Sequence, residues 1–466
     1  MRDLTRGPLP NHILAMALPI GFGMLVQTLY YLVDLYFVSQ LGDTAIAGVS
    51  AAGNVMFLVM AVTQVLSVGT VALVSHAAGR DDRDQADLVF NQAFALSAFL
   101  FVGTLVGGYL GLADGYMTRI GADEATVAAG LAYLRWFLVA LSLQFLIVAL
   151  GAALRGTGVV KPTMVVQMLT VVVNIVLTPI LVAGWITGHA FGVAGAGMAS
   201  AASVLVGVLL MTYYFFHAER YVAFRPSRWR PRFDLLRRLL AIGLPSGGEF
   251  ALLFVYVAVI YRLIRDFGPD AQAGFGVGMR VMQAIFLPAM AIAFATPAIA
   301  GQNFGARLPV RVRGTFRSAA WMSVAVMAAL TLICQIRPSW FVAPFSDDPE
   351  VLAVAAEYLR IISLNFVATG LIFTSGGMFQ AMGNTVPSLL SSATRLVTFV
   401  LPAIWVSGRP GFELRHLWYM SVATVGLQAA MNLALLYREF GRRLKFDPDP
   451  DGRQKKMATP AGGHCR

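Results

Sequence analysis

Two carboxylates lie inside long apolar runs, where a charged side chain is costly. Asp34 sits in the first run, which stays apolar through Val38 and so argues against a position at the membrane surface. Glu249 follows Pro245 by four residues, next to three small residues that would admit water. Ionisable groups inside a membrane are functional by default, because desolvation penalises them. We predict that Asp34 and Glu249 bind a proton or a cation.

Polar residues in two further runs are candidate companions of these carboxylates. Asn174 and Thr178 are four residues apart and therefore share one face of a helix. Pro179 lacks an N–H group and frees a backbone carbonyl that can coordinate a cation. Ser200, in the sixth run, can join the same site. Asn, Ser and Thr also hydrogen-bond neighbouring membrane helices, so this structural alternative stays open.

Two arginines in the second half of the chain also lie within apolar runs. They are Arg280 and Arg395, and each can pair with Glu249 across a helix bundle. Neither has a charged counterpart in the first half. A structural ion pair and a relay for substrate or protons are both compatible with this pattern.

The sequence carries no nucleotide, metal or redox motif. It has no Gly-x-x-x-x-Gly-Lys-Ser/Thr loop, no His-Glu-x-x-His and no Cys-x-x-Cys, and its two cysteines are Cys334 and Cys465. We therefore expect no enzymatic activity, no cofactor and no metal site. An ion gradient is the energy source that remains, with H⁺ or Na⁺ as the coupling ion.

Composition places the chain in a membrane. Of 466 residues, 58% are hydrophobic and 13% are charged, and mean hydropathy is +0.70. Soluble domains carry about 25% charged residues, so a chain with half that share cannot cover itself with polar surface. Its apolar runs are continuous and long enough to cross a bilayer as helices. Twelve such runs predict an all-α integral membrane protein: 11–38, 46–76, 88–111, 125–150, 161–184, 193–217, 237–264, 271–300, 314–336, 351–377, 387–407 and 416–438.

The basic residues are distributed unequally between the two sides of the predicted membrane. If loops alternate sides, one side holds 25 of the 35 Lys and Arg residues and the other side holds 8, with Arg280 and Arg395 inside spans. The basic side includes both termini and the loop that we assign to Arg155 and Lys161. Cytoplasmic loops are enriched in Lys and Arg, so we expect both termini in the cytoplasm. The net charge of +11 is then a consequence of topology, and no nucleic-acid partner is expected.

The chain contains a tandem repeat of six runs. Leu18-Pro19 matches Leu244-Pro245, and Gly79 matches Gly305, both at one constant offset along the chain. After a single-residue gap, Gly158 and Pro162 match Gly383 and Pro387. Since each copy has an even number of spans, both copies have the same orientation, as in parallel-repeat transporters.

The repeat defines two pseudo-symmetric six-helix bundles and four segments. These are an N-terminal lobe at 1–218, a basic linker at 219–238 that we expect to lie along anionic lipid, a C-terminal lobe at 239–440 and a polar tail at 441–466.

The ordered set of motifs resembles the multidrug and toxic compound extrusion family. The set comprises Leu18-Pro19 followed by Val33-Asp34, the pair Gly158-x3-Pro162 and Gly383-x3-Pro387, Gly301–Gly305, and Asn174 through Pro179. The resemblance covers about residues 10–440. It implies two six-helix lobes around a central cleft, and export of drugs by alternating access against inward H⁺ or Na⁺.

The resemblance also assigns roles to residues. The family's first-span aspartate corresponds to Asp34 and its fifth-span asparagine to Asn174. Many members carry an aspartate where this chain has Thr178, which favours H⁺ over Na⁺. The family's seventh-span glutamate lies one helical turn deeper than Glu249.

We therefore expect a secondary active exporter of amphipathic or cationic drugs in the bacterial inner membrane, working as a monomer. The alternatives are a lipid-linked sugar flippase of the same superfamily and a non-transporting scaffold. Flippases tend to carry extra helices and a strongly basic cavity, and the buried charges argue against a scaffold.

Overall fold

The computed structural model describes residues 1–186, 188–345 and 348–446, apart from the side chains of residues 30–32, 34 and 35. Most of the expected polar tail, with Cys465, therefore lies outside the described residues.

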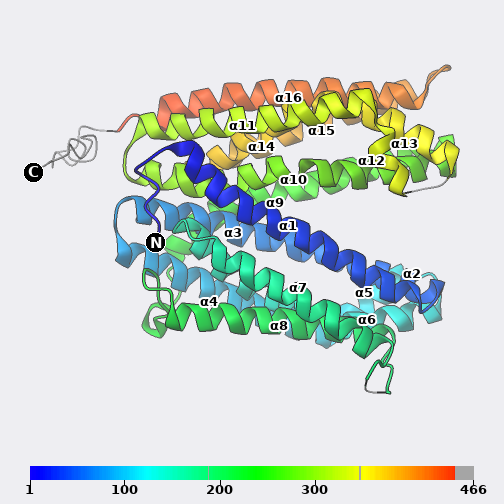
Figure 1. Cartoon of the computed structure of the whole chain (residues 1–466), viewed down its shortest axis with the longest axis horizontal. Coiled ribbons are helices and arrows are strands. Elements are labelled where there is room, and N and C mark those ends of the chain that lie inside the picture. The colour runs from blue at the N-terminus through cyan, green and yellow to red at the C-terminus, as the bar shows by residue number, and fades with distance from the viewer. Residues whose placement is uncertain (187, 346–347, 447–466) are drawn as a thin grey trace, which may run out of the picture.

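The described chain is helical and forms two lobes that lie side by side, with α1 running along their junction (Figure 1). The N lobe contains α1 (Leu9–Ser39), α2 (Asp43–Gly53), α3 (Val55–Gly79), α4 (Arg83–Gly107), the π-helical segment η1 (Gly108–Leu112), α5 (Ala113–Ile120), α6 (Glu124–Gly156), α7 (Lys161–Val182) and α8 (Val193–His217). The C lobe contains α9 (Phe233–Ile264), η3 (Arg265–Phe267), α10 (Pro269–Gly305), α11 (Pro309–Ile336), α12 (Ser339–Val342), η4 (Ala343–Phe345), α13 (Pro349–Ile362), η5 (Ser363–Asn365), α14 (Phe366–Ala381), α15 (Val386–Ser407) and α16 (Leu414–Arg443). In the sequence, the short 3₁₀ helix η2 (Pro226–Arg228) lies in the linker between the two lobes.

In the described part of the chain, twelve segments are long and apolar enough to cross a membrane, which confirms the expected number of spans. Three expected spans are interrupted helices. The second breaks at Asn54, between α2 and α3, and the tenth passes through η5. The third contains η1, where Gly111 has a φ of 112° that favours glycine. These breaks are invisible to a count of apolar residues, because apolar residues continue on both sides of them.

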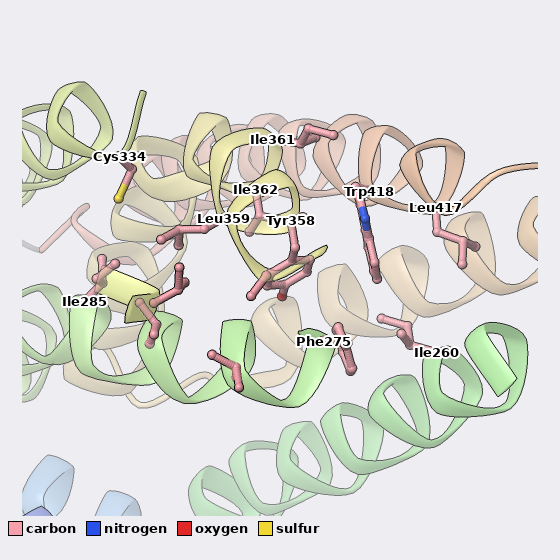
Figure 2. Packing of buried hydrophobic residues seen from close by; sticks show 14 of the residues in the cluster. Ile260, Phe275, Ile285, Cys334, Tyr358, Leu359, Ile361, Ile362, Leu417 and Trp418 are labelled. Carbon is pink, nitrogen blue, oxygen red and sulfur yellow. The ribbon is translucent and has the colours of Figure 1, made fainter. Parts of the chain in front are cut away.

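An aromatic cluster forms the core of the C lobe (Figure 2). Phe275 of α10 stacks on Trp418 of α16, with ring centroids 5.6 Å apart and planes 6° apart. Tyr358 of α13 packs edge-on against both rings. The cluster joins α10, α13 and α16 into one body, because aromatic pairs add specific geometry to the burial of large side chains.

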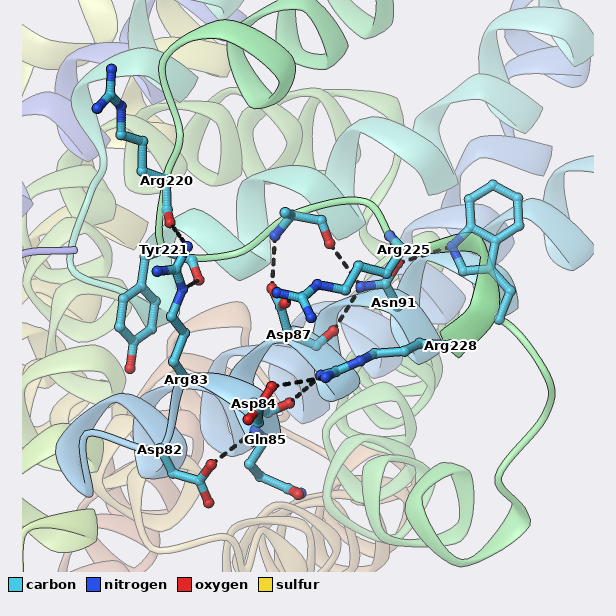
Figure 3. A network of polar contacts seen from close by, with 12 residues as sticks. Asp82, Arg83, Asp84, Gln85, Asp87, Asn91, Arg220, Tyr221, Arg225 and Arg228 are labelled. Carbon is cyan, nitrogen blue, oxygen red and sulfur yellow. Dashed lines mark hydrogen bonds and ion pairs between the residues drawn. The ribbon is translucent and has the colours of Figure 1, made fainter.

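The linker between the lobes binds to the N lobe, at the start of α4 (Figure 3). Arg225 forms an ion pair with the buried Asp87, with Nε and Oδ2 2.7 Å apart, and Arg228 pairs with Asp84 at 2.8 Å. Asn91 accepts the backbone N–H of Arg225 and the indole N–H of Trp229, and donates to the carbonyl of Ala223. Arg225 and Arg228 of the linker are therefore bound to carboxylates of α4. The linker is also shorter than expected, since α9 already begins at Phe233.

The same linker segment is partly buried. Phe224 packs against Phe90, Phe94 and Phe215, with ring centroids 4.9 to 5.6 Å apart. Burial, with the Asp81 and Asp82 carboxylates nearby, raises the pKa of Tyr221 to about 12, so its phenol is neutral at physiological pH. The linker is thus a structural part of the N lobe.

The two lobes meet most closely at the end of the molecule that holds the N-terminus, the linker and the start of α11, which we call the basic end. Here α3 packs against α9 and α10. The imidazole Nε2 of His76 lies 2.6 Å from the carbonyl oxygen of Ala381 in the other lobe. A Cβ on Gly79 would lie 1.9 Å from the carbonyl oxygen of Gln302, and one on Gly305 would lie 2.2 Å from that of His76. Only glycine permits this backbone approach. The ribbons of the lobes diverge towards the opposite end, where α2 and α5 lie on one side and α12 and α13 on the other (Figure 1).

We predict that Gly305→Ala opens the basic end, because its Cβ would meet backbone rather than a flexible side chain. Overpacking of this kind costs about 1–3 kcal/mol, enough to populate a separated state. Spin labels on Arg80→Cys and Val310→Cys, with Cys334 and Cys465 replaced, would measure this by double electron–electron resonance. The distance distribution should shift to longer values. Gly103→Ala is the matched control, because nothing lies within 4 Å of its added Cβ, and identical distributions in the two variants would contradict the prediction.

Candidate functional site

A cavity of about 250 Å³ lies between the lobes. The N lobe contributes α1, α3, α6 and α7 to its walls, and the C lobe contributes Phe294 and Pro297 of α10 and Gln380 of α14. Its lining mixes apolar side chains with the amides of Gln64, Gln167 and Gln380. Apolar walls with a few polar groups are typical of small-molecule sites. Because both lobes line it, any relative movement of the lobes changes the cavity.

The charged group of this cavity is Arg155. It belongs to the last turn of α6 and lines the cavity, which corrects the expectation that it lies in a loop. Its Nη2 donates to the hydroxyl of Ser67 on α3 at 2.7 Å. Among the described residues that line the cavity there is no carboxylate.

The N-terminal segment closes the basic end beside the cavity. Leu4 is fully buried between the lobes, in a cluster with Val160 and Ile299. Its N–H donates to Gln302 Oε1 at 3.0 Å, and its carbonyl accepts from Asn303 at 3.1 Å. On the other side, the N–H of Arg2 donates to the carbonyl of Thr157 in the N lobe at 2.9 Å. Residues 2–4 therefore connect the α6–α7 turn to the end of α10.

The predicted N-lobe coupling residues are brought together only in part by the described structure. Asn174 and Thr178 of α7 are fully buried, and the Thr178 hydroxyl donates to Asn174 Oδ1 at 3.4 Å. Ser200 of α8 is also buried. Asn174 Nδ2 has no hydrogen-bond acceptor among the described residues, although it is buried. Asp34 is in α1, and its side chain lies outside the described residues.

Glu249 contacts a residue that the sequence did not single out. Its carboxylate lies near the hydroxyl of Ser388, in the first turn of α15. The side chains of Arg280 and Arg395 form no ion pair with it in the described part of the chain. Arg280 is exposed on α10. The structure therefore does not support the pairing that we considered between Glu249 and either arginine.

Arg395 of α15 lies over an aromatic ring. Its Cζ is 4.4 Å from the ring centroid of Tyr256 on α9, a cation–π geometry, and its buried Nε has no described hydrogen-bond partner. The Tyr256 hydroxyl lies 2.8 Å from Ser421 Oγ on α16.

One turn before Arg395 on α15, Ser391 donates to Asn432, and Ser392 accepts from Gln428. Both partners are on α16. With Ser388 and Arg395 these residues form a polar stripe along α15. The spacing of Ser388, Ser392 and Arg395 was a signal for this stripe, because residues three or four apart share a helix face.

Sequence reasoning missed Arg155 for a different reason. The apolar run of α6 continues past residue 150 to Leu154, so the expected end of the span came one turn early. Only the packing of α3 against α6 shows that this guanidinium points at Ser67 and into the cavity.

The MatE family model matches residues 19–180 and 245–405. The starts of these two segments, 19 and 245, are equivalent positions of the internal repeat, and so are their ends, 180 and 405, beyond the single-residue gap. Two relatives are similar over most of their length. The "Probable multidrug resistance protein NorM" of Thermotoga maritima is 24% identical over 427 residues, covering 91% of each chain. The "FAD transporter" of Shewanella oneidensis is 24% identical over 406 residues, covering 86% of this chain and 88% of the relative.

Solved structures have the same fold. An outward-facing multidrug resistance MATE family transporter of the MOP superfamily has a TM-score of 0.88 at 24% identity, covering 95% of this chain and 98% of that chain. A MOP superfamily transporter from Pyrococcus furiosus, described as having a binding pocket of reverse polarity, has a TM-score of 0.87 at 24% identity and the same coverage.

We predict that Leu4→Ala loosens the basic end. Removing a buried leucine side chain costs about 2–5 kcal/mol, and here the loss falls on the contact between the lobes. Hydrogen-exchange mass spectrometry should show faster exchange in residues 2–7 and 156–159, whose amides include the Arg2 N–H. The aromatic core of the C lobe should stay protected. Leu14→Ala on the exposed face of α1 should change neither region, and unchanged exchange in Leu4→Ala would refute the role of this segment.

Proposed function

The chain belongs to the MatE family, and on that premise we propose that it is a secondary active exporter of amphipathic or cationic drugs. Export is coupled to inward H⁺ rather than Na⁺. The observation that carries the proposal is the cavity of about 250 Å³, which residues of both lobes line next to a closed basic end. A site shared by two matched lobes is what alternating access requires. The name of the Thermotoga maritima relative, a probable multidrug resistance protein, points the same way.

We assign the basic end to the cytoplasm of a bacterial inner membrane. It holds most of the basic residues, and cytoplasmic loops are enriched in them. The state with this end closed is then outward-facing. Proteins with both lobes in one chain need no partner for this cycle, so we propose a monomer.

In the proposed mechanism, the Asp34 carboxylate takes up a proton from outside. Asn174, Thr178 and Ser200 form its polar surroundings, and the unpaired Asn174 Nδ2 supplies a donor for the ionised form. Protonation removes that interaction, so the packing of α1 on α7 and α8 changes. Coupling requires the proton and the drug to bind one state of the lobes differently from the other. In the C lobe, Glu249 with Ser388 and Arg395 with Tyr256 are the groups available for a relay.

The first test of the proposed function concerns Asp34. Cells that express the wild type should extrude ethidium, and Asp34→Asn at matched membrane abundance should lose most of this efflux, because the amide cannot titrate. Asp43→Asn is the control, since Asp43 is exposed at the start of α2.

Equal efflux by the wild type and Asp34→Asn would remove Asp34 from the mechanism and direct attention to Glu249. No efflux from either would contradict drug export, and a lipid-linked sugar flippase would be the next activity to test.

The second test of the proposed function concerns the coupling ion. In proteoliposomes, a pH gradient without Na⁺ should drive ethidium transport, and a Na⁺ gradient at equal pH should not. The reason is that Thr178 leaves the N-lobe site one carboxylate short of a typical cation cage. Transport driven by Na⁺ alone would overturn proton coupling while leaving export intact.

A further inference from the structure

We propose that the cavity between the lobes binds the anionic group of an amphipathic substrate, a carboxylate or sulfonate, through the guanidinium of Arg155. This inference rests on the proposed export function and defines its substrate class. It extends that class from the cationic compounds expected from the sequence to acidic and zwitterionic ones.

The first argument is the state of charge of the cavity. Arg155 forms no ion pair in the described chain, and its hydrogen-bond partner is the neutral hydroxyl of Ser67 at 2.7 Å. A guanidinium is always charged and has five N–H donors. One hydroxyl leaves most of these donors free, and no described lining residue carries a carboxylate that would take them. A bound anion would supply both the countercharge and the acceptors.

The second argument is the start of α7. Val160, which precedes α7, and Thr163 and Met164 of its first turn all line the cavity. The N-terminus of a helix carries a partial positive charge and unpaired N–H groups, so it favours an anion. The Thr163 hydroxyl is buried there without a hydrogen-bond partner among the described residues. Arg155 of α6 and the start of α7 therefore both contribute positive potential to the cavity. The Thr163 hydroxyl is in addition a donor without an acceptor among the described residues.

The third argument is what surrounds the charge. Val68, Val71 and Val148 give the cavity an apolar wall, and Phe294 adds an aromatic ring from the C lobe. A substrate would place its anionic group at Arg155 and its apolar body against these residues. When the basic end opens, Phe294 and Gln380 separate from the N lobe. A bound anionic substrate would therefore stabilise the closed and the open state to different extents.

The opposing interpretation is that Arg155 only ties the end of α6 to Ser67 of α3. A ligand pair that differs in charge but scarcely in shape distinguishes the two. Naphthalene-2-sulfonate is an anion, and naphthalene-2-sulfonamide is neutral at pH 7. Both would be titrated by isothermal calorimetry into the full-length protein in nanodiscs, with empty nanodiscs subtracted.

We expect the wild type to bind the sulfonate about tenfold more tightly than the sulfonamide, or better, as hydrogen bonds to charged groups imply. Arg155→Gln should bring the ratio of the two affinities near one while the sulfonamide still binds, which also reports an intact cavity. Ser67→Ala should keep the preference. Arg80→Gln removes an exposed positive charge outside the cavity lining and should also keep it.

No preference in the wild type, or a preference that survives Arg155→Gln, would overturn the inference. If Arg155→Gln does not fold, Arg155→Lys replaces it. Its ammonium lacks the planar fork, so the ratio should fall several-fold, and an unchanged ratio would overturn the inference. Ethidium efflux is measured separately. Efflux without sulfonate preference would refute only the anion site, and a preference dependent on Arg155 without any efflux would refute only drug export.

Discussion

The close approach of backbones at the basic end is the constraint on which the rest of the arrangement depends. Gly79 and Gly305 occupy equivalent positions in the two repeats, and each brings its helix end against a backbone carbonyl of the other lobe. This contact leaves room for neither side chain. It places His76 against Ala381, which follows Gln380 of the cavity wall. Because both glycines serve the same interface from opposite sides, the pseudo-symmetry of the chain is visible in the contact itself.

The two lobes have diverged where they meet the linker. Asp87 and Asn91 of α4 hold the linker through ion pairs and hydrogen bonds. The equivalent positions of the second repeat are Arg313 and Arg317 of α11, which lie beside a groove of about 690 Å³ between α11 and α16. The same fold therefore carries a bound segment in one lobe and an open, mostly apolar groove flanked by two arginines in the other. A duplicated chain keeps its helix packing while its surface chemistry changes, because packing between helices tolerates little change and the surface tolerates more.

The polar residues inside the lobes follow one physical rule. A polar group within the membrane needs a partner, and many have one: Tyr256 has Ser421, Thr178 has Asn174, and Ser391 has Asn432. The exceptions among the described residues are informative. They include Asn174 Nδ2, Thr163 Oγ1 and Arg395 Nε, which are buried without hydrogen-bond partners. Orphaned polar atoms are costly, so they mark where a proton, an ion or a ligand would contribute most.

The sequence by itself determined the class, the number of spans and the duplication. Apolar runs of sufficient length force helices in a bilayer, and the register of the internal repeat reappears in the two segments that match the MatE family. The candidate site was predicted less completely from the sequence. Asp34 and Asn174 were singled out as candidates because a carboxylate and an amide stand out in apolar runs, whereas Arg155 was missed because the expected span ended one turn too early. Tertiary structure alone decided that Arg155 faces a cavity, that Glu249 contacts Ser388 instead of an arginine, and that residues 2–4 bridge the lobes. These facts depend on which helix faces pack together, and periodicity within one helix contains no information about its neighbour.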